Sequence, residues 1–143
     1  MLKNIPSILG PDLLHALRAM GHGDDIAIVD ANFPAENSGP PVIRLDGISA
    51  TDTLDAILTL MPLDSFVDVP AHGMEVVGDP AAREQTHKDF AALVDKHEPG
   101  MKFGLIERFA FYEAVNNAYA IVQTGERRLY GNVLLKKGII RPS

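Results

Sequence analysis

The chain has 143 residues, of which 46% are hydrophobic and 22% are charged. This composition is typical of one globular domain, which we expect to span residues 1–143, and it excludes a disordered chain and a coiled coil. The net charge of −6 argues against nucleic acid and an acidic membrane surface as partners, because both attract clustered Lys and Arg.

Cysteine is absent from the sequence. Its absence excludes disulfides, thiolate chemistry and cysteine-based zinc sites, and it fits a reducing compartment. The hydrophobic runs, such as Ala118–Val122, fall far short of the ~18 residues that indicate a membrane span. No signal-peptide stretch precedes Pro6. We therefore expect a cytoplasmic protein.

Helical and strand patterns alternate along the chain. Apolar residues at helical spacing predict helices over residues 11–20, 51–61, 80–97 and 109–119. Short apolar runs predict strands over residues 26–29, 42–45, 65–69, 74–77, 103–106, 119–123 and 129–136. The glycine of Thr124-Gly125-Glu126 suits a hairpin turn between the last two strands. The order of elements predicts a layered α/β/α fold with a mixed β-sheet.

Two polar residues flank the predicted strand 26–29. His22 stands between two glycines, where an imidazole can exchange protons near neutral pH or can simply be solvated. Asp30 follows the strand, and ligands of open α/β sheets bind beyond strand ends. Its carboxylate could equally cap the loop 31–41, whose Pro and Asn content and length are typical of a functional loop.

The last third of the chain holds two more candidates. Arg108 follows the predicted strand 103–106 and carries a fork of donors that suits several hydroxyl groups. A surface ion pair with Glu107, with the following aromatic residues in the core, is the alternative. Tyr130-Gly131-Asn132 combines a backbone open to close approach with an amide that donates and accepts, as sugar hydroxyls require. A bulged hairpin strand would use the same three residues.

Several common catalytic signatures are missing. The sequence contains no glycine-rich nucleotide loop and no nucleophile elbow. A metal site made of His22, Asp24 and Asp30 is an alternative, but no second histidine lies at ligand spacing from His22. We therefore expect neither a metal nor a cofactor.

Six motifs occur in a particular order: Leu13–Asp24, Asp30–Ala35, Ile43–Gly47, Arg108–Glu113, Thr124–Glu126 and Tyr130–Asn132. Together they resemble the family of L-fucose mutarotases and D-ribose pyranases over nearly the whole chain. The Arg-Phe-Ala-Phe-Tyr-Glu block and Tyr-Gly-Asn are similar to the fucose branch, whereas the stretch 67–78 departs from the family pattern.

The resemblance implies an isomerase that interconverts the α and β anomers of L-fucose without metal or cofactor. The sugar ring opens to the aldehyde and recloses, and positioned acid–base groups typically accelerate such proton transfers by ~10²–10⁴-fold. By the resemblance, His22 is the catalytic proton donor. The residues that it assigns to sugar binding are Asp30, Arg108, Tyr130, Gly131 and Asn132. The base stays open among Tyr112, Tyr130 and an ordered water.

The resemblance also implies a homo-oligomer, commonly a decameric ring, with sites in clefts between neighbouring subunits. Two other functions stay open from the sequence. One is a D-ribose pyranase, which interconverts the pyranose and furanose forms. The other is a non-enzymatic monosaccharide-binding protein, in which Asp30, Arg108 and Asn132 would matter and His22 would be dispensable.

Overall fold

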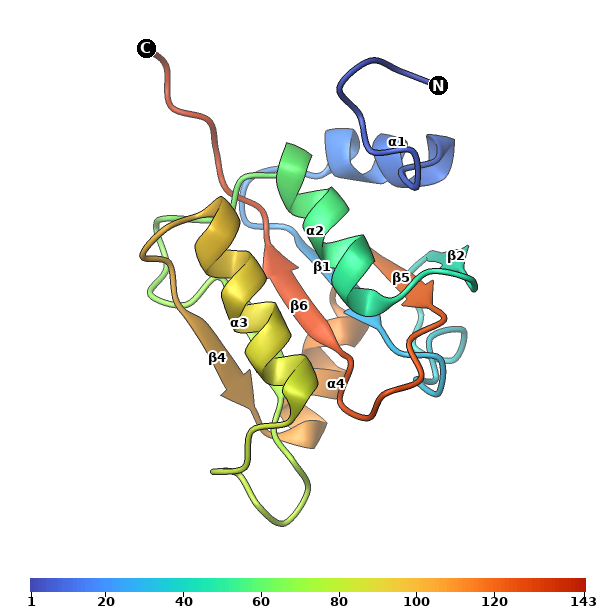
Figure 1. Cartoon of the computed structure of the whole chain (residues 1–143), viewed down its shortest axis with the longest axis vertical. Helices are drawn as coiled ribbons and strands as arrows, with labels where there is room; N and C mark the ends of the chain where they lie inside the picture. Colours follow the sequence, from blue (N-terminus) through green and yellow to red (C-terminus); the bar gives the residue numbers. More distant parts are fainter.

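The apolar strand that follows His22 forms the centre of a six-stranded sheet. A computed structural model describes all 143 residues. Its helices are α1 (Pro11–Ala19), α2 (Ala50–Leu60), α3 (Gln85–His97) and α4 (Arg108–Asn116). Its strands are β1 (Asp25–Val29), β2 (Val42–Leu45), β3 (Ala71–Met74), β4 (Phe103–Ile106), β5 (Ala120–Thr124) and β6 (Val133–Lys136). Helices lie on both sides of the sheet (Figure 1), so the predicted α/β/α layering is confirmed.

The sheet is mixed and has the strand order β2-β5-β1-β6-β3-β4. β5 runs parallel to β1 and β2, whereas β6 runs antiparallel to β1 and β3. The predicted hairpin between β5 and β6 is therefore wrong, because β1 lies between them. Gly125 starts the connection by donating its N–H to the carbonyl oxygens of Leu45 and Ile48, which ties it to the loop after β2.

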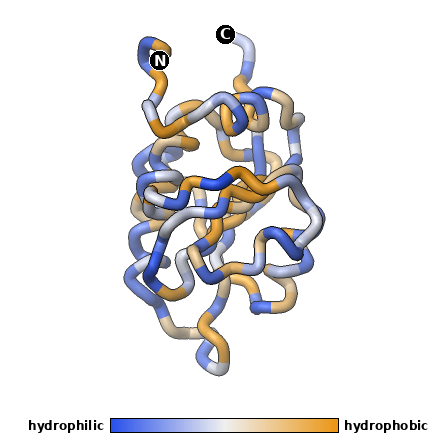
Figure 2. The backbone as a smooth tube through the Cα atoms, turned by 90° about the vertical axis from the view of Figure 1, so that its right-hand side faces the viewer, coloured by the Kyte–Doolittle hydropathy of each residue, from blue (hydrophilic) through white to orange (hydrophobic).

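Alternation along β1 explains why both faces of the sheet are covered. Ile26 and Ile28 belong to a buried cluster with residues of α1, α2 and α3, and Ala27 and Val29 belong to a second cluster with α4. In Figure 1, α2 and α3 lie in front of the sheet and α4 lies behind it. In Figure 2, hydrophobic segments run through the middle of the molecule, and both termini lie at one end.

Two predicted elements differ for local reasons, and the strand predicted over residues 74–77 lies instead at Ala71–Met74. Residues 65–68 form bends instead of a strand, because the Asp64 side chain accepts the N–H of Phe66 at 3.0 Å and turns the chain. α3 begins at Gln85 rather than after Asp79-Pro80. Asp79 instead closes a turn with Val76, and Glu84 caps the helix through a capping box with His87.

The ends of the other elements follow ordinary rules. Ser49 caps α2 by accepting the N–H of Asp52 at 3.1 Å. α4 ends at Asn116 and β6 begins at Val133, so both are shorter than predicted. None of the helices is long and apolar enough to cross a membrane.

The close approach at Gly125 makes a prediction about stability. A Cβ atom there would collide with the backbone carbonyl of Asp46, whereas one at Gly47 would meet nothing within 4 Å. We expect Gly125→Ala to lower the free energy of unfolding by about 1–3 kcal/mol, because the backbone must move. Thermal unfolding measures this, with Gly47→Ala as the matched control. Equal melting temperatures for the two variants would contradict the packing described.

Candidate functional site

A cavity of ≈ 260 Å³ opens beyond the carboxyl end of β1. This is smaller than the ~300–1,000 Å³ clefts of drug-sized ligands, and it suits a monosaccharide. Polar and aromatic side chains converge on it from the loops after β1 and β3, from the start of α4 and from the loop before β6. Its lining is Asp30, Asn32, Phe33, Pro34, Met74, Val77, Arg108, Tyr112, Leu129, Tyr130 and Asn132.

Asp30 and Asn132 form a buried reciprocal pair at the base of this cavity. The Asn132 amide donates to Asp30 Oδ2 at 3.1 Å, and its Oδ1 accepts the Asp30 N–H at 2.8 Å. Asp30 Oδ1 accepts the N–H of Asn32 at 3.0 Å. Burial raises the pKa of the Asp30 carboxyl, and the hydrogen bonds from Asn32 and Asn132 offset this rise in part. The carboxylate is thus oriented by its neighbours and faces a small polar space.

Gly131 and Tyr130 need special backbone geometry. A Cβ on Gly131 would lie 2.6 Å from the Glu126 side chain and 3.4 Å from Asp30 Cβ, so only glycine fits. Tyr130 has a φ of 58°, a left-handed conformation that costs a non-glycine residue of order 1–3 kcal/mol. The Tyr130 hydroxyl accepts the N–H of Val77 at 3.0 Å. Its own proton is therefore free to be donated into the cavity.

An ion-pair network that the sequence patterns did not reveal holds this loop. Arg128 bonds to Glu126 Oε1 at 2.9 Å and to Asp89 Oδ2 of α3 at 2.8 Å. Glu126 is buried, and its carbonyl oxygen accepts the N–H of Ala31 at 2.9 Å. Because Arg128 lowers the pKa of both carboxyl groups, they stay charged at neutral pH. The network fixes the loop 125–132 against the residues that follow β1.

Arg108 is the least satisfied polar group of the cavity. Its Nε is buried without a hydrogen-bond partner, and its Cζ lies 4.4 Å from the centre of the Phe109 ring. Glu107 forms no ion pair with it and instead caps α4 by accepting the N–H groups of Phe109 and Ala110. Phe109 is 64% exposed, so the predicted alternative of a surface pair above a core Phe109 is wrong. An unpaired guanidinium donor is suited to a polar ligand.

Tyr112 also lines the cavity. It comes from the second turn of α4 and packs against Phe33, with ring centres 5.4 Å apart. The structure therefore brings together all the residues predicted to bind sugar, with Tyr112 beside them. Met74 and Val77 join them from the stretch 67–78, the part of the chain that departs from the family pattern.

His22 lies elsewhere in the chain. It precedes β1, whereas Asp30 follows it, so the five residues of β1, at ~3.3 Å each, separate the two. Within one chain, His22 therefore lies away from the cavity. For the same reason, His22, Asp24 and Asp30 do not form the alternative metal site.

A buried carboxylate orients the His22 ring. Its Nε2 lies 2.9 Å from Asp64 Oδ1, and the side chains are 41% and 4% exposed. The N–H of Phe66, followed by the His22 hydrogen bond, lowers the pKa of Asp64, so its carboxylate accepts the Nε2 proton. Nδ1 makes no hydrogen bond within this chain. The exposed Phe66 ring packs 5.1 Å from the imidazole.

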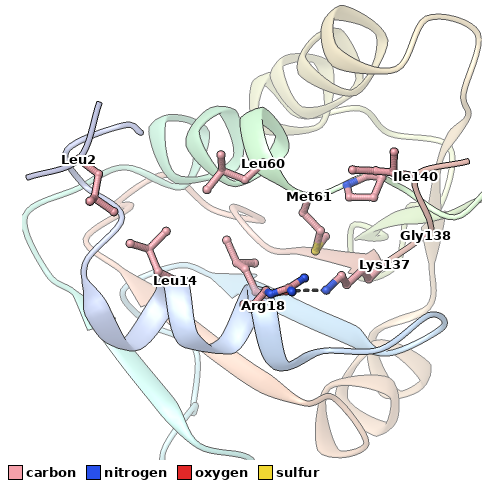
Figure 3. A pocket seen from close by; sticks show the side chains of 10 residues that line it. Leu2, Leu14, Arg18, Leu60, Met61, Lys137, Gly138 and Ile140 are labelled. Atoms are coloured by element: carbon pink, nitrogen blue, oxygen red, sulfur yellow. Dashed lines mark hydrogen bonds between the residues drawn. The ribbon is translucent and has the colours of Figure 1, made fainter. Parts of the chain in front are cut away.

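A larger cavity of ≈ 530 Å³ lies between α1, the end of α2 and the C-terminal segment (Figure 3). Its lining is mostly aliphatic and includes Leu14, Leu60, Met61 and Ile140. Lys137 lines it too, but its Nζ donates to the carbonyl oxygens of Leu17 and Met20. Apart from Arg18 and Lys137 its labelled side chains are apolar, so this cavity offers a sugar fewer polar groups than the one beyond β1.

The fold and the site define a class: a layered α/β protein with a small cavity, lined by polar and aromatic side chains, beyond the central strand. The chain belongs to the RbsD / FucU transport protein family, whose model matches residues 3–140. The resemblance found in the sequence is thereby confirmed.

The relatives add detail. The fucose mutarotase of Bos taurus is 42% identical over 151 residues, covering 99% of this chain and 96% of that protein. The crystal structure of the Streptococcus pneumoniae fucose mutarotase in complex with L-fucose is 41% identical, with a TM-score of 0.90 and coverage of 98% and 100%. Bacillus subtilis RbsD complexed with D-ribose is 20% identical, with a TM-score of 0.74 and coverage of 99% and 100%, which is a similarity of fold alone.

The raised pKa of Asp30 is open to a direct test. Ligand binding by the carboxylate should be present above this pKa and should be lost as the pH falls through it. By ¹³C NMR titration we expect the carboxyl of Asp30 to titrate above its ordinary 3.8. Asn132→Ala should raise this pKa further, because the carboxylate loses a donor. The control, Asn117→Ala, removes an exposed amide just after α4. A pKa that falls in Asn132→Ala would contradict the pairing.

Proposed function

We propose that this protein is a cofactor-independent isomerase that interconverts the α and β anomers of L-fucose in the cytoplasm. The observation that carries the proposal is the convergence of Asp30, Arg108, Tyr130 and Asn132 on one cavity of monosaccharide size. Relatives that are 41–42% identical over nearly the whole chain and are fucose mutarotases support it. Their identity is about twice that of the ribose-complexed relative, which favours fucose over ribose.

The cavity residues bind the sugar hydroxyls. Asp30 accepts hydrogen bonds, Arg108 and the Tyr130 hydroxyl donate them, and Gly131 lets the sugar approach the backbone. Asn132 acts mainly by orienting Asp30, because both its amide oxygen and its amide nitrogen are bonded to that residue. Together these groups fix the orientation of the ring, which leaves the ring oxygen and the anomeric hydroxyl for the acid and the base.

The reaction needs two proton transfers. An acid protonates the ring oxygen while a base removes the proton of the anomeric hydroxyl, so that the bond between C1 and the ring oxygen breaks and the aldehyde forms. After rotation about C1–C2, the hydroxyl formed from the ring oxygen attacks the other face of the aldehyde. Its proton returns to the acid, and the base returns its proton to the anomeric oxygen. His22 is the acid, through Nδ1, and Asp64 stabilises the imidazolium. Tyr112, Tyr130 or a water serves as the base.

Because His22 lies at the other end of β1, we propose that a neighbouring copy of the chain supplies it. Phe66, which is 61% exposed, lies beside His22, and three exposed apolar side chains lie at or next to the cavity: Val77, Phe109 and Leu129. Docking the surface around Phe66 onto the surface around the cavity is a head-to-tail contact, which forms a ring when the rotation between copies closes and a filament when it does not. We propose the closed form, a homo-oligomeric ring, and a decamer fits the family resemblance.

Saturation-transfer NMR on equilibrated L-fucose tests the activity. Irradiating one anomeric proton in the presence of trace protein should transfer saturation to the other. We expect His22→Ala to reduce this exchange by about 10²–10⁴-fold, because the acid is lost. His15→Ala is the control, since His15 is an exposed residue of α1.

Three outcomes would count against this account. Undiminished exchange in His22→Ala would remove His22 from the mechanism. Binding of fucose without exchange by the unaltered protein would indicate a sugar-binding protein. Exchange of D-ribose with no exchange of L-fucose would indicate a pyranase.

A further inference from the structure

We infer that Thr86 is a positioning residue for Tyr130, and that its hydroxyl holds the turn that aims the Tyr130 side chain into the cavity. Thr86 lies in the first turn of α3, outside the cavity lining, and is 1% exposed. The inference rests on the proposed function only in so far as Tyr130 contacts the sugar.

The Thr86 hydroxyl contacts the strained part of the loop. Its Oγ1 lies 3.1 Å from the carbonyl oxygens of both Leu129 and Tyr130, so its one proton is shared between the two acceptors. These carbonyls flank the Tyr130 residue whose φ is 58°. A non-glycine residue stays in that region only where its surroundings enforce it. In this loop, Thr86 is the side chain that binds both sides of the residue.

The next residue of α3 supports the Tyr130 ring. His87 is 1% exposed, and its ring centre lies 6.0 Å from that of Tyr130. The His87 ring is fixed at both nitrogens: Nδ1 accepts the N–H of Glu84 at 3.1 Å, and Nε2 donates to the Met74 carbonyl oxygen at 2.9 Å. Burial lowers the pKa of His87, so it stays neutral and rigid. The start of α3 thus supports the backbone of Tyr130 through the Thr86 hydroxyl and supports the Tyr130 ring through His87.

The consequence for the site lies at the Tyr130 hydroxyl. The hydroxyl bonds to the N–H of Val77 only while the ring keeps its present direction. That bond occupies the oxygen as an acceptor and leaves the proton as a donor to the ligand. If the turn at Tyr130 relaxes, the hydroxyl leaves both Val77 and the sugar. Thr86 would therefore affect sugar binding without touching the sugar.

Three variants separate this role from a general role in stability. Thr86→Val keeps the size and loses the hydroxyl, and Thr86→Ser keeps the hydroxyl. Thr53→Val is the matched control, because Thr53 is also fully buried on a helix and donates to a backbone carbonyl, that of Ser49, at 2.8 Å. Each variant is measured by saturation transfer over a range of fucose concentrations and by thermal unfolding.

We expect Thr86→Val to raise the KM for L-fucose about tenfold. Where Tyr130 only binds the sugar, kcat should change by less than about twofold, since the lost contact then binds substrate and transition state alike; a fall of kcat as well would identify Tyr130 as the base. Thr86→Ser should restore KM. Thr53→Val should lower the melting temperature by a similar amount and leave both constants unchanged. Wild-type constants in Thr86→Val, or an equal rise of KM in Thr53→Val, would overturn the inference.

The crystal structure of Thr86→Val gives a readout that does not depend on activity. In it we expect Tyr130 to leave the left-handed region and its hydroxyl to lose the Val77 N–H. If the unaltered protein does not exchange fucose, the proposed function fails, and this structure alone decides the role of Thr86. A Tyr130 that keeps its φ of 58° in the variant would show that the hydroxyl does not hold the turn.

Discussion

The site depends on one buried interaction, the reciprocal pair between Asp30 and Asn132. It joins the residue that ends β1 to the residue that precedes β6, the two antiparallel strands at the centre of the sheet. A buried carboxylate is costly unless hydrogen-bonded, and these donors recover only part of that cost, since the pKa of Asp30 stays raised. The remaining unfavourable desolvation is what a ligand with several hydroxyl groups can relieve.

The loop around this pair follows from the same constraint. For Asn132 to reach Asp30, the loop before β6 must cross the end of β1. Gly131 allows the close approach, and Tyr130 takes a left-handed turn. The ion pairs of Arg128 with Glu126 and Asp89 then hold the crossing in place. The chain keeps an energetically unfavourable backbone conformation at this end of the sheet, as is common where a ligand binds.

Local patterns predicted most of the elements and, with the family resemblance, the cavity residues. The spacing in α1 and the β-branched run of β1 are signals contained in a few neighbouring residues. The pairing of β5 with β1 rather than with β6 is not encoded in neighbouring residues, because it depends on where Gly125 docks against the loop after β2. The bends at residues 65–68 were not predicted for a similar reason: the short apolar run favours a strand, and one Asp64 hydrogen bond overrides it. Thr86 and Arg128 act through contacts with distant parts of the chain, which sequence spacing does not reveal.

The two ends of β1 carry different parts of one chemistry. The carboxyl end has the cavity and an unpaired guanidinium donor, and the other end has an oriented imidazole with no substrate site of its own. A single chain thus holds the proposed binding groups and the proposed acid too far apart to cooperate. The proposed head-to-tail ring would resolve this, because every subunit would then give its histidine to one neighbour and receive one from the other.

The most direct test of this account is to mix two inactive variants within one oligomer. His22→Ala and Asp30→Ala should each lack fucose exchange alone. Co-expressed in equal amounts, they should recover about a quarter of the wild-type rate. A shared site is active when one copy supplies an intact His22 and its neighbour an intact Asp30, and random assembly gives this arrangement at one site in four. Mixed oligomers that stay inactive would contradict a site shared between two copies of the chain.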